Sequence, residues 1–123
     1  MRRVPGLQVW AFDRRSQAFE DTSGFRSGDP KKAEDYYLGF KYKRVVGADV
    51  PYVGRWGLKQ SLEDLRRVVR KARAGGRRKV ILGGHSLGAS TTVAYAAWDF
   101  NGRPGYKDLA GICLLYTSPS PRD

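Results

Sequence analysis

The chain has 123 residues, 41% of them hydrophobic and 12% aromatic, which is the composition of a small globular protein. No apolar run reaches the length of a membrane span, and Pro5 interrupts any signal-peptide segment after the basic start, so the localisation is left open. A single cysteine, Cys113, excludes an internal disulfide framework, and the single histidine, His85, argues against a metal site built from several histidines. We expect neither a metal nor a cofactor.

Basic residues dominate the charge, with 23 Lys and Arg against 12 Asp and Glu and a net charge of +11. Eight of them are concentrated between Arg66 and Lys79. Such a cluster is either the solvated face and basic end of an amphipathic helix or a surface that binds nucleic acid or another polyanion. The helical spacing favours the solvated face. We therefore expect no nucleic-acid partner and keep a polyanion-binding module as the alternative function.

The N-terminal part predicts a strand and then a long excursion. Residues 7–13 are rich in aromatic and β-branched types and predict a strand, with Asp13 holding the following turn by hydrogen bonds. Residues 20–56 are irregular apart from a helix over 31–38, which Asp29 and Pro30 can start. Residues 40–46 could be strand or loop.

Aromatic side chains are frequent in the 20–56 excursion. Two interpretations stay open: the rings form a lid or the wall of a substrate pocket, or they only pack the excursion onto the domain. The aromatic residues concerned are Phe25, Tyr36, Tyr37, Phe40, Tyr42, Tyr52 and Trp56.

The second half of the chain alternates helices and strands. Apolar residues at three- and four-residue steps predict a helix over 57–74. A strand over 79–83, a helix over 86–98 and a strand over 109–115 follow. This order predicts an α/β fold with a parallel βαβ sheet.

A serine lies at the predicted strand-to-helix turn, in the pattern Gly84-His85-Ser86-Leu87-Gly88. A serine on such a sharp turn requires small flanking residues, because side chains there would collide with the adjacent strand or helix. Its hydroxyl would lie at the helix N-terminus, where free N–H groups and the helix dipole favour developing negative charge.

The pattern and its context resemble the α/β-hydrolase family, particularly its lipases and esterases. The resemblance implies that Ser86 is the nucleophile at a nucleophile elbow and that the backbone N–H of Leu87 is an oxyanion donor. Gly84, His85 and Gly88 would be structural residues of the elbow, with His85 as its variable position. The implied substrate is a small or lipid-like ester, or a related acyl compound.

The resemblance also implies parts that this chain does not contain. In the family the triad acid and then the histidine follow the serine, yet the 37 residues from Leu87 to Asp123 include no histidine. We assign neither Asp99 nor Asp108 as the acid. The upstream central strand, with its oxyanion loop, and the C-terminal strands are also missing. Residues 1–112 are therefore expected to be a partial hydrolase domain that is inactive by itself.

The last residues change to a composition rich in proline and serine. Residues 113–123 also resemble the translated read-through of a sequencing adapter. We expect this segment to be a non-native coil.

Overall fold

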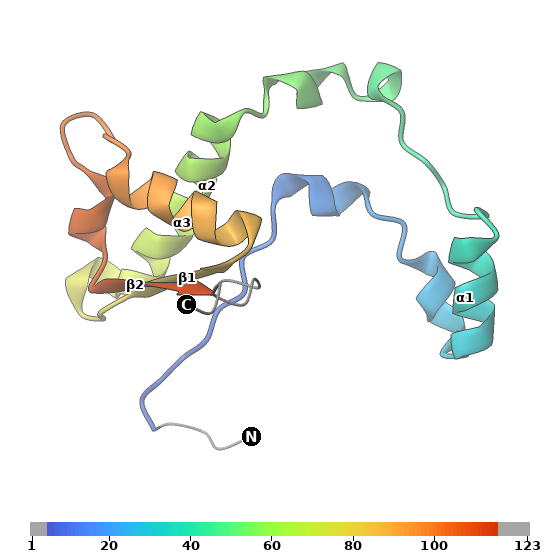
Figure 1. Cartoon of the computed structure of the whole chain (residues 1–123), viewed down its shortest axis with the longest axis horizontal. Helices are drawn as coiled ribbons and strands as arrows, with labels where there is room; N and C mark the ends of the chain where they lie inside the picture. The colour runs from blue at the N-terminus through green and yellow to red at the C-terminus, as the bar shows by residue number, and fades with distance from the viewer. Residues whose placement is uncertain (1–4, 116–123) are drawn as a thin grey trace, which may run out of the picture. The chain divides into compact units, whose positions relative to one another are not determined.

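The computed structural model describes residues 5–115, which have a mixed α/β fold (Figure 1). The helices are α1 (Pro30–Leu38), α2 (Leu58–Arg73) and α3 (Leu87–Ala97), and the strands are β1 (Ile81–His85) and β2 (Gly111–Leu115). Short 3₁₀ turns occur in most of the connections between these elements. The chain divides into two compact units, Met1–Arg55 and Trp56–Asp123. None of the helices within residues 5–115 has the length and apolar character needed to cross a bilayer.

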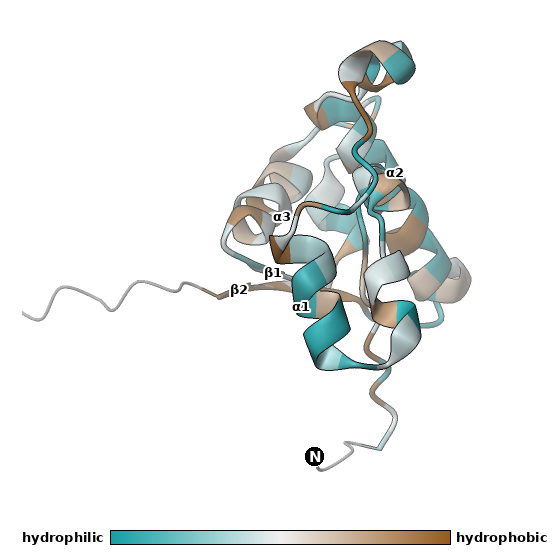
Figure 2. Cartoon of the chain, turned by 90° about the vertical axis from the view of Figure 1, so that its right-hand side faces the viewer, coloured by the Kyte–Doolittle hydropathy of each residue, from teal (hydrophilic) through white to brown (hydrophobic). Residues whose placement is uncertain are grey.

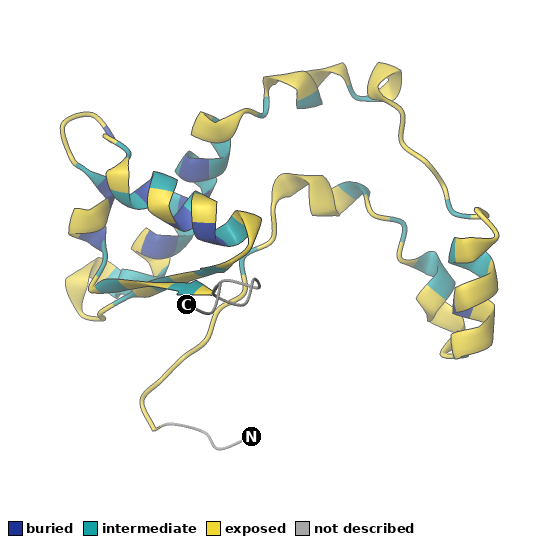
Figure 3. Ribbon diagram, in the orientation of Figure 1, coloured by how far each residue is buried: buried dark blue, intermediate teal, exposed yellow. Residues whose placement is uncertain are grey.

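In the first unit, α1 starts as its sequence predicts. The carboxylate of Asp29 accepts a hydrogen bond from the backbone N–H of Lys31 at 2.9 Å, and Pro30 occupies the first helical position. The helix is predominantly hydrophilic (Figure 2), and Ala33 is its buried residue (Figure 3). The helix expected over 31–38 is confirmed, and residues 40–46 form neither helix nor strand.

The strand expected over residues 7–13 is wrong, because this segment has no regular secondary structure. Its apolar side chains are exposed, Leu7 by 62% and Val9 by 87%. The tendency of such residues to form strands depends on packing against a neighbouring strand, and none is paired with this segment. The expected role of Asp13 is also not seen, since its carboxylate forms no hydrogen bond within residues 5–115.

In the second unit, α2 buries one stripe and exposes its charges. Leu62, Leu65 and Val69 are buried (Figure 3), in line with the predicted helix over 57–74. The helix ends at Ala74, which adopts the left-handed conformation (φ 46°, ψ 51°) that glycine more often supplies. The basic last turn suits the negative end of the helix dipole.

The two strands are parallel, and α3 forms part of the crossover between them (Figure 1). Ile81 pairs with Gly111 and His85 with Leu115, so the predicted parallel βαβ arrangement is confirmed. β1 begins two residues later than expected, because its paired length is set by a partner that starts only at Gly111. Val80 still accepts a hydrogen bond from the N–H of Ala110 at 2.7 Å.

β2 also bears on the expected coil over residues 113–123. Cys113, Leu114 and Leu115 belong to β2, in agreement with the strand expected over 109–115 and not with a coil that begins at Cys113. Residues 116–123 lie outside the described part of the chain, so the non-native origin of this segment stays a prediction.

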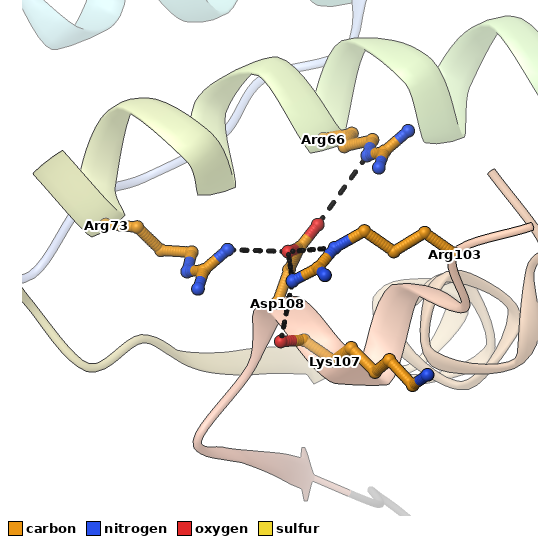
Figure 4. Close-up of polar contacts among 5 residues, drawn as sticks. All are labelled: Arg66, Arg73, Arg103, Lys107 and Asp108. Carbon is orange, nitrogen blue, oxygen red and sulfur yellow. Dashed lines mark hydrogen bonds and ion pairs between the residues drawn. The ribbon is translucent and has the colours of Figure 1, made fainter. Parts of the chain in front are cut away.

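A buried carboxylate joins α2 to the crossover (Figure 4). Asp108 is 4% exposed and precedes β2. Its Oδ1 accepts hydrogen bonds from Arg73 at 2.6 Å and from Nη2 of Arg103 at 2.9 Å, while its Oδ2 lies 3.6 Å from Nε of Arg66. Arg66 and Arg73 come from α2, and Arg103 from the loop after α3. We call these four residues the Asp108 cluster.

An aromatic pair lies against the cluster. The ring of Phe100 is 5.3 Å from the ring of Tyr95 and 4.3 Å from the guanidinium of Arg66. Tyr95 is fully buried, and its hydroxyl has no hydrogen-bond partner among the described residues. Burial, with a smaller contribution from the charge of Asp108, raises the pKa of Tyr95 to about 12.

We predict that Asp108→Asn destabilises the fold by about 3 kcal/mol, because it leaves three cations around an uncharged side chain. Urea unfolding followed by circular dichroism measures the change. Asp99→Asn makes the same chemical change at an exposed carboxylate and should stay within about 0.5 kcal/mol of wild type. Equal losses in the two variants would contradict the role given to the Asp108 cluster.

The raised pKa of Tyr95 predicts that the fold loses stability in alkali. The unfolded chain loses this phenolic proton near pH 10 and the folded chain only near pH 12, so stability falls as the pH rises through this window. Between pH 9 and pH 11, Tyr95→Phe should lose about 1 kcal/mol less unfolding free energy than wild type. An identical loss in both proteins would contradict the prediction.

Candidate functional site

Ser86 occupies a strained turn between β1 and α3. Its backbone has φ 54° and ψ −121°, a combination that costs a non-glycine residue about 1–3 kcal/mol. Hydrogen bonds hold the turn on both sides. The N–H of Ser86 donates to the carbonyl of Leu115 at 3.3 Å, and the carbonyl of Ser86 accepts from the N–H of Ala89 at 2.9 Å. The turn is therefore tied both to the end of β2 and to the first turn of α3.

Close packing explains why Gly84, one of the two glycines that flank the turn, has no side chain. A Cβ atom on Gly84 would overlap the carbonyl of Gly88 and lie only 2.6 Å from the nitrogen of Ala89, so β1 and α3 meet without room for a side chain. A Cβ atom on Gly88 would meet no described atom within 4 Å. The expectation that both positions exclude side chains is thus confirmed for Gly84 and wrong for Gly88, whose helical position faces open space.

The groups at the turn that could take part in a reaction are accessible to solvent. Ser86 is exposed, and its hydroxyl forms no hydrogen bond with any described residue. Leu87 is 63% exposed, and as the first residue of α3 it has a backbone N–H without an intrahelical acceptor. The turn therefore presents a hydroxyl next to a free backbone donor at the positive end of a helix dipole.

His85, the variable position of the expected elbow, is neither buried nor hydrogen-bonded to any described residue, so a packing or hydrogen-bonding role for this side chain is not seen. It is the last residue of β1, it is exposed, and its ring forms no hydrogen bond within residues 5–115.

No acid or base is coupled to Ser86 in the described part of the chain. Asp108 is engaged by three arginines, and Asp99 belongs to a bridge with Pro104 beyond the other end of α3. No group of three His, Cys, Asp or Glu residues is arranged to hold a metal ion anywhere in the region described. Within residues 5–115 the turn presents a hydroxyl and one backbone donor, and no side chain forms a hydrogen bond with that hydroxyl.

Seven of the eight basic residues of the 66–79 stretch divide into two sets. Arg66 and Arg73 turn toward Asp108, and Nε of Arg77 donates to the carbonyl of Ala74 at 3.1 Å. Arg70 and Lys71 are exposed, as are Arg67 and Lys79. Arg67, Arg70 and Lys71 thus resemble a solvated face of α2, whereas Lys79 follows the helix.

Two features were missed by sequence reasoning. The Asp108 cluster joins residues 35 and 5 positions apart, and nothing local in the sequence marks that pairing. The first unit also contains a cavity of about 550 Å³. The aromatic residues of the 20–56 excursion were the available signal for it.

Comparison of the chain with protein-family models, with characterised proteins and with solved structures found no match. The function therefore has to be argued from the site.

We predict that Gly84→Ala destabilises the fold by about 2–3 kcal/mol, because the added methyl group forces β1 and α3 apart. Gly88→Ala is the matched control and should be neutral or up to about 1 kcal/mol more stable, since alanine favours the helix. Urea unfolding measures both. A neutral Gly84→Ala would contradict the close packing.

Proposed function

We propose that Ser86 is the nucleophile of a serine hydrolase of the α/β-hydrolase type, which cleaves an ester or a related acyl bond. The observation that carries the proposal is the backbone of Ser86, a non-glycine residue at φ 54° and ψ −121° between a strand and a helix. Strain of this size persists only where packing enforces it, and such residues cluster at active sites. The tight contact between Gly84 and Gly88 is the packing that enforces it here.

The proposed reaction uses the free groups at the turn. The hydroxyl oxygen of Ser86 attacks the acyl carbonyl carbon while a base takes its proton, and the resulting oxyanion accepts a hydrogen bond from the N–H of Leu87. Collapse of the tetrahedral intermediate expels the alcohol and leaves an acyl-serine, which water hydrolyses. No cofactor takes part.

The proposal includes low activity for the chain by itself. Without a histidine after Ser86 in the triad position to accept the proton, and with one oxyanion donor, Ser86 should acylate slowly. An external base such as imidazole should accelerate the step, because it takes the place of the missing side chain.

The test is covalent labelling of the chain with an alkyl fluorophosphonate, read by peptide mass spectrometry. Ser86 attacks phosphorus and displaces fluoride, and its proton passes to imidazole. We expect an adduct on Ser86, formed faster as imidazole increases and on the order of 10² times faster than on Ser90, which lacks an oxyanion donor. Ser86→Ala should remove that adduct, and Ser90→Ala should leave it unchanged.

Labelling spread evenly over the exposed serines would contradict the proposal. The same would be true of labelling at Ser86 that does not respond to imidazole.

Polyanion binding through Arg66–Lys79 is the second candidate, favoured by the exposed Arg70 and Lys71 on α2. It predicts DNA binding that weakens steeply with salt, and Arg70→Gln with Lys71→Gln should lower the log–log salt slope by about 2. Lys31→Gln with Lys32→Gln on α1 removes the same charge and is the control. Equal effects of the two pairs, or no binding at low salt, would contradict this candidate.

A further inference from the structure

Three buried polar atoms of the second unit have no hydrogen-bond partner among the described residues. They are Nε of Arg66 on α2, the hydroxyl oxygen of Tyr95 on α3, and Oδ2 of Asp108 in the 3₁₀ turn before β2. Leaving such a group unbonded in a protein interior costs free energy, so native structures rarely do so. Where the chain itself supplies no partner, an ordered water commonly does.

The three atoms belong to one part of the unit. Nε of Arg66 lies 3.6 Å from Oδ2 of Asp108 (Figure 4). The ring of Phe100 lies between Arg66 and Tyr95, 4.3 Å from the guanidinium of the first and 5.3 Å from the ring of the second. Burial is the main cause of the raised pKa of Tyr95, and the charges of Asp108 and Arg66 also act on it. The hydroxyl is therefore within electrostatic range of both.

The two oxygens of Asp108 differ in how the chain satisfies them. Oδ1 accepts direct hydrogen bonds from Arg73 at 2.6 Å and from Nη2 of Arg103 at 2.9 Å. Oδ2 is too far from Nε of Arg66 for a direct hydrogen bond. A single oxygen atom about 2.9 Å from both atoms would bond to each of them, and contacts of this length are often bridged in that way.

The chemistry of the three atoms defines what binds there. The Nε–H group of Arg66 can only donate, the carboxylate oxygen of Asp108 can only accept, and the hydroxyl of Tyr95 can do either. An anion would be repelled by Asp108, and a metal cation would be repelled by the three arginines around it. The ligand is therefore small and neutral, and it both donates and accepts.

We propose that the second unit binds one buried water molecule between Arg66, Tyr95 and Asp108. The water accepts a hydrogen bond from Nε of Arg66, donates one to Oδ2 of Asp108 and forms a third with the hydroxyl of Tyr95. Three bonds are typical of a buried water. Tyr95 is fully buried and Asp108 is 4% exposed, so this water exchanges slowly with solvent. It joins α2, α3 and the turn before β2 on the side of Asp108 that the arginines leave unsatisfied.

A crystal structure of the whole chain, at a resolution that shows ordered water, tests the geometry. We expect one water oxygen at hydrogen-bond distance from all three atoms. A direct hydrogen bond from Tyr95 or from Nε of Arg66 to Oδ2, with no water between them, would overturn the proposal.

The solution test is a rotating-frame Overhauser experiment on the isotope-labelled chain, which separates dipolar transfer from proton exchange by the sign of the cross peak. We expect a dipolar cross peak between water and the Nε–H proton of Arg66, because a buried water stays bound long enough to transfer magnetisation. The same proton of Arg70, an exposed residue of the same helix, is the control and should show none. Equal behaviour of Arg66 and Arg70 would contradict a buried water.

Two matched substitutions test the third partner. Tyr95→Phe removes one of the three bonds to the water, so the Arg66 cross peak should fall to about half or less. Tyr106→Phe makes the same chemical change at a residue that is 57% exposed and should leave the peak unchanged. An unchanged peak in Tyr95→Phe would overturn the assignment of the site. If Tyr95→Phe does not fold, the crystal structure of the unsubstituted chain decides.

Discussion

The second unit depends on a buried carboxylate. Asp108 brings Arg66 and Arg73 of α2 together with Arg103 of the crossover loop, so the helix and the returning chain share one charge (Figure 4). Taking such charges out of water costs free energy, and a buried ion pair often contributes little net stability. Its consequence is positional: of the possible arrangements of α2 against the crossover, those that leave Asp108 without a cation are strongly disfavoured.

The Ser86 turn is the second constraint, and it relies on close backbone packing. Gly84 lets β1 approach α3 so closely that the strained serine has no easy route to relax. Leu115 secures the other side through its carbonyl, which links the turn to β2 and so to the chain that follows Asp108. The turn therefore keeps an exposed hydroxyl in a conformation that an isolated peptide would rarely adopt.

The helices and the parallel strands followed from the sequence because their signals are local. The apolar stripe through Leu62, Leu65 and Val69 repeats at the helical period, and Asp29 caps α1 by a contact two residues away. The strand expected over 7–13 failed for the opposite reason: its residues favour strands only when a neighbouring strand covers them. The first unit is instead organised by hydrogen bonds to Asp21 and by aromatic contacts.

The candidate site shows the same difference between local sequence signals and contacts made across elements. The sequence by itself determined the serine between two glycines, the strand before it and the helix after it, because that pattern is contained in a few consecutive residues. Only the tertiary structure decided that Gly84 is sterically required and Gly88 is not, and that Asp108 is occupied by arginines. Both outcomes depend on atoms that meet across elements, and the spacing of residues along the chain carries no information about those distances.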